Sequence, residues 1–279
     1  MTEKELGAHL GYATPNKLEI MMTRARLVFA FTLFSIVSSS LLGVTTLAAD
    51  FDVVKAKLEA AMASDVRSEA DVARDRNRKP IPTLEFFGLR DDMKVVELIP
   101  GGGWYTMLLA PVLSEKGEFY IAYSASRAMA KLKDKPGFEK LKLTAKDANF
   151  NRPEGQRFYD LTSTDLGVKK VDIVFTFRNY HNFTDETRSA MNASAYKALK
   201  KGGTYAVVDH TRRHMQKLDN ENGRRIDPVL AIKEIEAAGF EFVDYSSLHY
   251  RPDDELQYEV GRKTITGNTD RWTLKFRKP

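Results

Sequence analysis

The fold of this chain is decided by the stretch Lys94-Val95-Val96-Glu97-Leu98-Ile99-Pro100-Gly101-Gly102-Gly103-Trp104-Tyr105-Thr106. Residues 94–99 have the apolar pattern of a buried strand, and the residues after the three glycines have the pattern of a helix. Glycines carry no side chain, so backbone N–H groups in such a turn can approach a ligand closely at a helix N-terminus. Doubly wound α/β folds hold nucleotides in this way. Consecutive glycines also occur in flexible surface turns, but the strand and helix on either side favour a ligand site.

The glycine turn lacks the two common nucleotide-binding fingerprints. The pattern G-x-G-x-x-G would need a glycine where Thr106 stands and a carboxylate about 20 residues further on. Between residues 117 and 133 the only candidate is Glu118, at the start of the next predicted strand. The phosphate loop G-x-x-x-x-G-K-[ST] is absent too, because no Gly-Lys-Ser/Thr follows the turn. These absences argue against a dinucleotide-dependent dehydrogenase and exclude a P-loop hydrolase.

The remainder of the chain alternates predicted strands and helices, which is typical of a mostly parallel sheet with right-handed crossovers. Strands are expected at residues 94–99, 119–123, 157–161, 171–178, 204–209, 241–248 and 272–276. One or two helices are expected within residues 52–76, and others at 83–89, 104–113, 126–134, 137–147, 184–200 and 228–238. The sequence therefore predicts an α/β, doubly wound, Rossmann-like sheet of seven strands preceded by N-terminal helices.

Functional groups in such a sheet lie at the carboxyl ends of the strands, near the switch point between strands one and four. This rule selects Glu97 with the glycine turn, Tyr123 and Ser124, Arg178 through His181, and Asp209 with His210. Either histidine could serve as a general base, because imidazole titrates near neutral pH. Each could instead cap a turn or bond a neighbour. Asp209 could orient His210 or a substrate group, or cap the next segment.

A metal site is not expected at these residues. Asp209 and His210 are adjacent on an extended strand, so their side chains should point to opposite faces. The chain also has no cysteine, which excludes catalytic thiols, disulfides and thiolate metal ligands.

Composition fits one ordinary globular domain, since 43% of the 279 residues are hydrophobic and 29% are charged. The formal net charge is +5, but basic and acidic residues are interleaved, so no nucleic-acid surface is expected. The densest basic stretch contains Arg212, Arg213, His214, Lys217, Arg224 and Arg225. Near a cleft it would favour an anionic acceptor such as a carboxylate or phosphate, whereas on a loop it would simply face solvent.

The N-terminus has the pattern of a secretory signal peptide. Arg24 and Arg26 precede an apolar stretch over residues 27–49, which closes with small residues before Asp50. The polar residues 1–20 precede this segment, so translation is expected to start at Met21 or Met22. An uncleaved membrane anchor is the alternative, because the stretch is long enough to cross a bilayer. In either case residues 50–279 form the domain, outside the cytoplasmic membrane, as a periplasmic or secreted protein or one anchored to the membrane.

Four strings in the chain together resemble a bacterial family known as predicted methyltransferases. They are Arg78-Lys79-Pro80, Pro100 to Thr106, Phe177 to Asn182, and Val208 to His210. The segment from Glu97 to Gly103 also resembles the first motif of class I S-adenosylmethionine-dependent methyltransferases, with Ile99 in place of the first glycine. The resemblance implies a methyltransferase sheet whose last strand is antiparallel, with S-adenosylmethionine as the cofactor.

The resemblance also implies roles for the residues selected above. The expected cofactor-binding residues are Glu97, Pro100, Gly101, Gly102, Gly103, Tyr123, Asp160, Arg178 and Asn179, with Asp160 near the adenine. The expected catalytic residues are His181, His210 and Asp209, with the histidines facing a small acceptor. Tyr123 stands where class I enzymes usually have the carboxylate that binds the ribose hydroxyls.

Two alternatives to a methyltransferase remain open. The first is an exported, non-catalytic binding protein that keeps the fold and holds another small ligand; S-adenosylmethionine is made in the cytosol, which favours this alternative for an exported domain. The second is an exported hydrolase built on His181, Asp209 and His210. The hydrolase is disfavoured because the chain has no G-x-S-x-G nucleophile turn.

Overall fold

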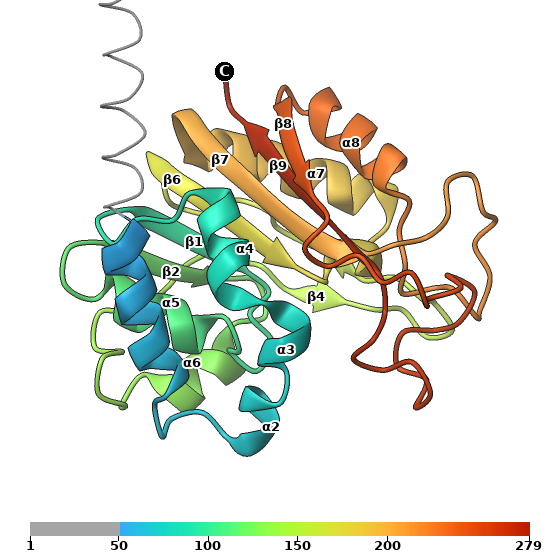
Figure 1. Ribbon diagram of the computed structural model, residues 1–279. Coiled ribbons are helices and arrows are strands. Elements are labelled where there is room, and N and C mark those ends of the chain that lie inside the picture. The colour runs from blue at the N-terminus through green and yellow to red at the C-terminus, as the bar shows by residue number, and fades with distance from the viewer. Residues whose placement is uncertain (1–50) are drawn as a thin grey trace, which may run out of the picture. The chain divides into compact units, whose positions relative to one another are not determined.

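A seven-stranded sheet forms the centre of the domain (Figure 1), and the computed structural model describes residues 51–279. In spatial order the strands are β3 (Lys142–Leu143), β2 (Glu118–Ala122), β1 (Lys94–Leu98), β6 (Val171–Phe177), β7 (Leu199–His210), β9 (Arg271–Arg277) and β8 (Glu241–Ser246). The pairs β3–β2, β2–β1, β1–β6 and β6–β7 are parallel, whereas β9 runs antiparallel to both β7 and β8. This confirms the predicted doubly wound sheet and its antiparallel last strand.

The order of the strands creates a switch point between β1 and β6. From β1 the chain proceeds outward to β2 and β3, then returns to place β6 on the other side of β1. Crossovers on the two sides of this pair therefore lie on opposite faces, which leaves a crevice at the carboxyl ends of β1 and β6. The glycine turn follows β1, and residues 178–182 follow β6 at the same edge.

Helices cover both faces of the sheet, as Figure 1 shows for α4 and α5 on one face and α7 and α8 on the other. Residues 51–62 are helical, and the named helices are α2 (Glu69–Val72), α3 (Asp75–Arg78), α4 (Pro80–Phe87), α5 (Thr106–Leu113), α6 (Ser126–Leu132), α7 (Asp185–Ala198) and α8 (Pro228–Ala237). Neighbouring strand residues divide between the two cores: Val95 packs with α4 and α5, and Val96 packs with α7 and α8. This alternation explains why β1 is apolar throughout.

The segment between α6 and β6 differs from the sequence prediction. Residues 137–147 were expected to be a helix and residues 157–161 the third strand of the sheet. Instead, β3 within the first segment pairs with β2, while β4 (Phe150–Asn151) and β5 (Asp160–Leu161) form a separate two-stranded antiparallel sheet. The cause is tertiary, because edge pairing with β2 overrides the helical preference of a lysine- and leucine-rich segment.

The start of helix α7 was predicted correctly from its N-cap residue. Thr184 was expected to cap a helix over residues 184–200, and its side chain accepts a hydrogen bond from the Thr187 N–H at 3.3 Å. The helix ends at Ala198, slightly earlier than expected, because β7 already begins at Leu199.

The expected signal segment lies outside the described residues. Within residues 51–279, no helix combines the length and apolar composition that crossing a membrane requires.

Gly117 provides a test of how tightly α5, β1 and β2 are packed. A Cβ atom at this position would lie 2.7 Å from the Met93 carbonyl oxygen and 2.9 Å from that of Asp91. Because these are backbone atoms, we expect Gly117→Ala to lower the free energy of unfolding by about 3 kcal/mol in urea denaturation. Gly202→Ala is the control, since no atom lies within 4 Å and only the positive φ of 76° costs about 1 kcal/mol. Equal losses in the two variants would contradict this packing.

Candidate functional site

The turn after β1 has left-handed backbone conformations at its glycines and also at Ile99, which has a side chain. Ile99 has a φ of 54°, and Gly101 and Gly103 have φ values of 60° and 80°. A left-handed conformation costs a residue with a side chain about 1 kcal/mol, and more for a branched one. Ile99 thus adopts a conformation that favours glycine, at a cost that the surrounding contacts must offset.

Asn179 holds this turn against the end of β6. Its side-chain nitrogen donates to the Ile99 carbonyl at 3.1 Å and to the Phe177 carbonyl at 2.9 Å. The Ile99 N–H in turn donates to the Ala122 carbonyl at 2.8 Å. The ends of β1, β2 and β6 are therefore joined at the switch point, and Asn179 positions the turn through its carboxamide.

The glycine turn has an open face. A Cβ atom at Gly101 or Gly102 would meet only the Arg127 guanidinium, at 3.9 Å and 3.8 Å respectively. Pro100 is buried beside them, and its carbonyl accepts the Gly103 N–H at 2.9 Å. Space for a ligand therefore exists at Gly101 and Gly102, close to the start of α5, where backbone N–H groups are free of helical partners.

Glu97 lies beneath the turn and is fully buried. Its Oε2 atom accepts a hydrogen bond from the Thr106 hydroxyl at 2.6 Å, so the acid also fixes the first residue of α5. Burial raises the pKa of Glu97 to about 7, and the hydrogen bond and the positive charge of Arg78 oppose that rise.

This raised pKa predicts a pH-dependent stability. The folded state holds the Glu97 proton more tightly than the unfolded chain, so the stabilisation is complete below pH 4.5 and is lost as pH rises through 7. Glu97→Gln removes this titration and keeps an acceptor for Thr106. The variant's stability relative to wild type should therefore increase by about 3 kcal/mol between pH 4.5 and pH 8, measured by urea denaturation. A difference that does not change with pH would contradict the assignment.

Two of the other expected cofactor residues, Tyr123 and Asp160, differ in their exposure to solvent. Tyr123 is buried in the core, its hydroxyl donates to the Thr164 carbonyl, and burial raises its pKa. Asp160 is exposed in β5. The polar side chain left at the end of β2 is Ser124, which is exposed and, like Tyr123, has a positive φ.

Asp209 and His181 form a buried pair at the ends of β7 and β6. The Asp209 carboxylate accepts the backbone N–H of His181 at 2.9 Å and that of His210 at 2.6 Å, and lies 2.5 Å from His181 Nδ1. Since the carboxylate is an acceptor, Nδ1 carries a proton, and in the neutral form of the ring Nε2 is the atom with the lone pair. No hydrogen bond to Nε2 occurs among residues 51–279. Asp209 therefore orients His181, and not the ring of His210.

His210 is a neutral neighbour of this pair. Its Nδ1 lies 2.9 Å from the Thr269 hydroxyl, and the centroids of the two histidine rings are 5.7 Å apart. Burial, helped by the positive charge of Arg271, holds the pKa of His210 well below its usual range. The structure thus brings the three expected catalytic residues together and gives the histidines different surroundings.

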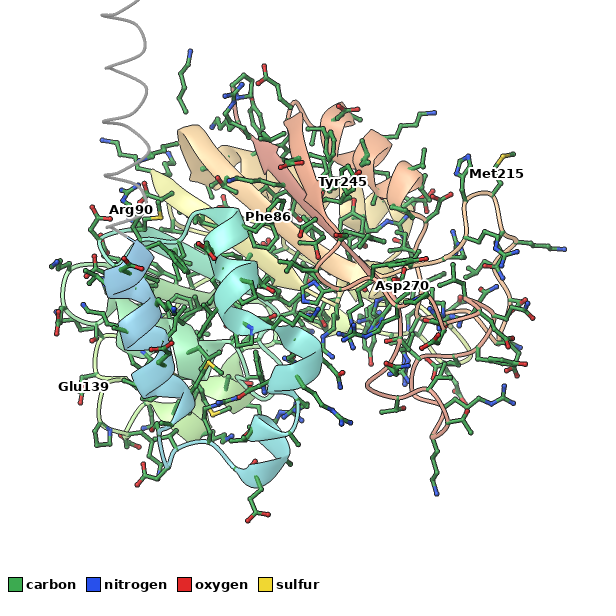
Figure 2. The ribbon with its side chains drawn as sticks, in the orientation of Figure 1. Phe86, Arg90, Glu139, Met215, Tyr245 and Asp270 are labelled. Carbon is green, nitrogen blue, oxygen red and sulfur yellow. The ribbon has the colours of Figure 1, made fainter. Side chains whose placement is uncertain are left out.

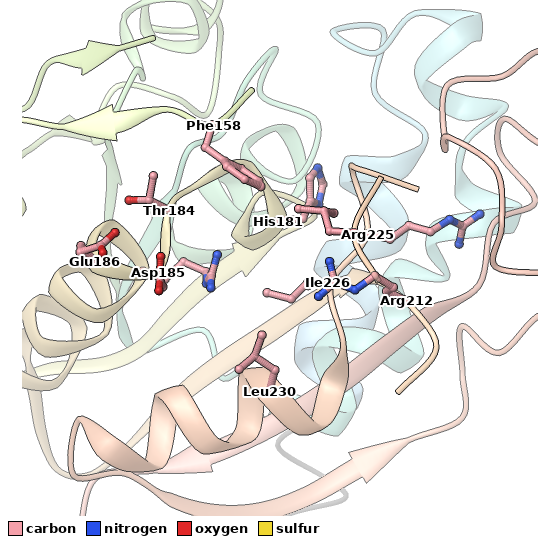
Figure 3. Close-up of a pocket in the computed structure, with 11 residues that line it drawn as sticks. Phe158, His181, Thr184, Asp185, Glu186, Arg212, Arg225, Ile226 and Leu230 are labelled. Carbon is pink, nitrogen blue, oxygen red and sulfur yellow. The ribbon is translucent and has the colours of Figure 1, made fainter. Parts of the chain in front are cut away.

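His181 lines two cavities. The first, of about 250 Å³, has Phe158 and His181 on one side and Leu230 on the other (Figure 3). The second, of about 420 Å³, is also lined by Arg178, Asn179 and His210. Neither cavity is lined by the glycine turn, by Tyr123 or by Asp160.

The residues of the basic stretch after β7 lie in different places relative to the two cavities. Arg212 and Arg225 line the first cavity and Arg224 the second, whereas Arg213 and His214 line neither. Arg225 pairs with Asp254 at 2.8 Å and 2.9 Å, and Arg224 pairs with Glu259 at 2.7 Å, so much of this charge is neutralised within the domain.

Two buried arginines at the second cavity had no role assigned from the sequence. Arg78 is buried with its guanidinium 4.3 Å from the centroid of the Trp104 ring, and burial lowers its pKa to about 10. Arg271, on β9, is equally buried. The string Arg78-Lys79-Pro80, one of the four that resemble a known family, could have drawn attention to Arg78. Nothing in the sequence around Arg271 indicates a functional role.

The Asp209 pair also predicts a large loss on substitution. Asp209→Asn replaces an acceptor oxygen by an NH₂ group in a site that supplies only N–H donors, so we expect a loss of about 3 kcal/mol in the free energy of unfolding. Urea denaturation measures it, with Asp165→Asn as the control. Asp165 pairs with Lys197 on the surface, where the loss should be below about 0.5 kcal/mol. Comparable losses would show that the buried carboxylate does not organise these strand ends.

Comparison with known proteins identifies the fold. No family model matches the chain, and no curated protein sequence matches it. Among solved structures, an S-adenosylmethionine-dependent methyltransferase from Aquifex aeolicus has a TM-score of 0.51 and 15% identity, over 74% of this chain and 93% of that one. The pyocyanin biosynthetic protein PhzM has a TM-score of 0.50 and 12% identity, over 75% of this chain and 56% of that one. The domain has the S-adenosylmethionine-dependent methyltransferase fold, as the sequence resemblance implied.

Proposed function

We propose that this protein is an S-adenosylmethionine-dependent methyltransferase that acts on a small acceptor with His181 as the base. One observation carries the proposal: the open glycine turn and the Asp209–His181 pair lie at the same edge of the sheet, at the ends of β1, β6 and β7. Asn179 links them physically, because it bonds to the turn and directly precedes the short helix that carries His181.

The residues at the turn fit the cofactor on its methionyl side. The open space at Gly101 and Gly102 would admit it, and Glu97, Pro100 and Gly103 would support the turn from beneath. When bound, S-adenosylmethionine supplies an electrophilic methyl group carried on a sulfonium. The ribose side differs from the usual pattern, since Tyr123 belongs to the core and Ser124 is the polar side chain at the end of β2.

His181 would perform the proton transfer. Its Nε2 atom would accept the proton that the acceptor hydroxyl or amine loses when it is methylated. The Asp209 carboxylate fixes the tautomer and stabilises the charge that develops on the imidazole. His210, kept neutral by its surroundings, adds no competing positive charge beside the base.

Isothermal titration calorimetry of the purified full-length chain tests the proposal. We expect S-adenosylmethionine and S-adenosylhomocysteine to bind with dissociation constants below about 1 mM. No binding of either at millimolar concentration would overturn the enzyme assignment.

Gly102→Leu tests whether the turn is the cofactor site. The added side chain enters space near which only the Arg127 guanidinium lies, and Gly102 does not have a positive φ, so stability should change by less than about 0.5 kcal/mol. The same side chain should weaken S-adenosylmethionine binding at least tenfold in calorimetry, because the ligand needs that space. Unchanged affinity in a stable variant would place the cofactor elsewhere.

The second candidate function is a non-catalytic binding protein that uses the same fold for another small ligand. Tyr123 favours the binding protein. Its side chain is buried with its hydroxyl bonded to Thr164, so the end of β2 has no carboxylate that could bind a ribose. Absence of S-adenosylmethionine binding in the calorimetry would support this candidate.

We also propose that the domain is exported, on the evidence of the signal-peptide pattern within residues 24–50. A reporter that is active only outside the cytoplasm, fused after Asp50, should be active. Activity of a cytosolic reporter alone would contradict export.

A further inference from the structure

The second cavity is unusual in the charge of its walls. Five of its lining residues are arginines, namely Arg74, Arg78, Arg178, Arg224 and Arg271, and none is an aspartate or glutamate. The other lining residues include His181 and His210. A concentration of like charge in one cavity costs free energy unless something of opposite sign enters it.

Two of the five arginines are neutralised by neighbouring acids. Arg74 pairs with Asp71, and Arg224 pairs with Glu259. Arg78, Arg178 and Arg271 have no salt-bridge partner among the described residues. The acids that act on them, such as Glu97 on Arg78 and Asp209 on Arg271, do so from beyond salt-bridge distance.

The three unpaired arginines also have few hydrogen bonds. Arg78 is 94% buried, and no side-chain hydrogen bond from it occurs in residues 51–279. Arg271 is equally buried and donates once, to the Asn77 carbonyl at 2.7 Å. The Nε atoms of Arg78, Arg178 and Arg271 are buried without a partner. Buried guanidinium groups with unused donors are rare unless an anion completes them.

Backbone and aromatic contacts hold these groups at the cavity. Arg178 has a positive φ of 59° directly after β6, and its N–H donates to the Val208 carbonyl at 2.6 Å. Arg78 lies on the Trp104 ring, which fixes the guanidinium without neutralising it. The site is therefore built into the fold and does not depend on mobile surface side chains.

We propose that this cavity binds the phosphate group of a small molecule, through Arg78, Arg178 and Arg271. Guanidinium groups donate in pairs to phosphate oxygens, and three of them match the charge and the several oxygens of a phosphate monoester dianion. A monocarboxylate carries one charge and two oxygens and would satisfy the site only in part. The identity of the phosphate-bearing molecule rests on the proposed function: it is the methyl acceptor, because His181 lines the same cavity.

Calorimetric titration of the full-length chain with inorganic phosphate at pH 8 tests the proposal. We expect a dissociation constant below about 1 mM for phosphate and binding at least tenfold weaker for acetate at equal ionic strength. Acetate binding as tight as phosphate would overturn the assignment, and so would no phosphate binding at about 10 mM.

Variants locate the bound phosphate. Arg178→Met removes a half-buried charge that makes no side-chain hydrogen bond in the described part of the chain, so it should weaken phosphate binding at least tenfold without lowering stability. Arg271→Met should weaken binding similarly. The control is Arg90→Met, because Arg90 pairs with Asp92 and lies at the far end of the sheet from Asp270, the neighbour of Arg271 (Figure 2). Equal affinities in folded Arg178→Met, Arg271→Met and Arg90→Met variants would overturn the proposed site.

The phosphate titration and the S-adenosylmethionine titration test the two proposals separately. Phosphate binding without S-adenosylmethionine binding would support this inference and overturn the methyltransferase proposal. S-adenosylmethionine binding without phosphate binding would support the methyltransferase proposal and overturn the phosphate site.

Discussion

The buried carboxylate of Asp209 is the constraint on which the site depends. It is inaccessible to solvent and accepts two backbone N–H groups and one imidazole N–H. A buried charge is tolerated only when such donors surround it, so the chain after β6 must turn back to bring His181 to the end of β7. The short helix Tyr180–Asn182 and the orientation of the His181 ring both follow from this requirement.

The four sequence strings that suggested a family are contacts of one structural unit. Arg78 lies on Trp104, the Tyr105 ring stacks on Phe177 with centroids 3.6 Å apart, and His181 bonds to Asp209. Each string thus contacts the next across the carboxyl edge of the sheet. Their separation along the chain reflects the order of strands, because β1, β6 and β7 are neighbours in space only.

Most of the fold could be predicted from local patterns, and the exceptions have a common cause. β1, β6 and α7 have apolar runs or caps that specify them by themselves, and they were found where the sequence placed them. Residues 137–161 have only weak helix and strand patterns. Pairing of β3 with the edge of β2 determines the structure of the first part of this segment. Local propensity carries no information about such pairing.

The rule that functional groups lie at the carboxyl ends of the strands selected His181, Asp209 and His210 from the sequence, and the structure places these residues together. Only the structure shows that Asp209 orients His181. Tyr123 was selected by its position at the end of β2, and its burial could not be read from the sequence. Arg271 lies on the antiparallel last strand, so its place at the cavity depends on the closing of the whole sheet.

We infer that Asp209 holds the neutral His181 ring with its proton on Nδ1, which leaves Nε2 free to act as a base. Nitrogen-15 NMR of the histidine side chains at pH 8 tests it directly, with a His181→Gln variant to assign the resonances. We expect the neutral His181 ring to be protonated on Nδ1. A ring protonated on Nε2 would contradict it.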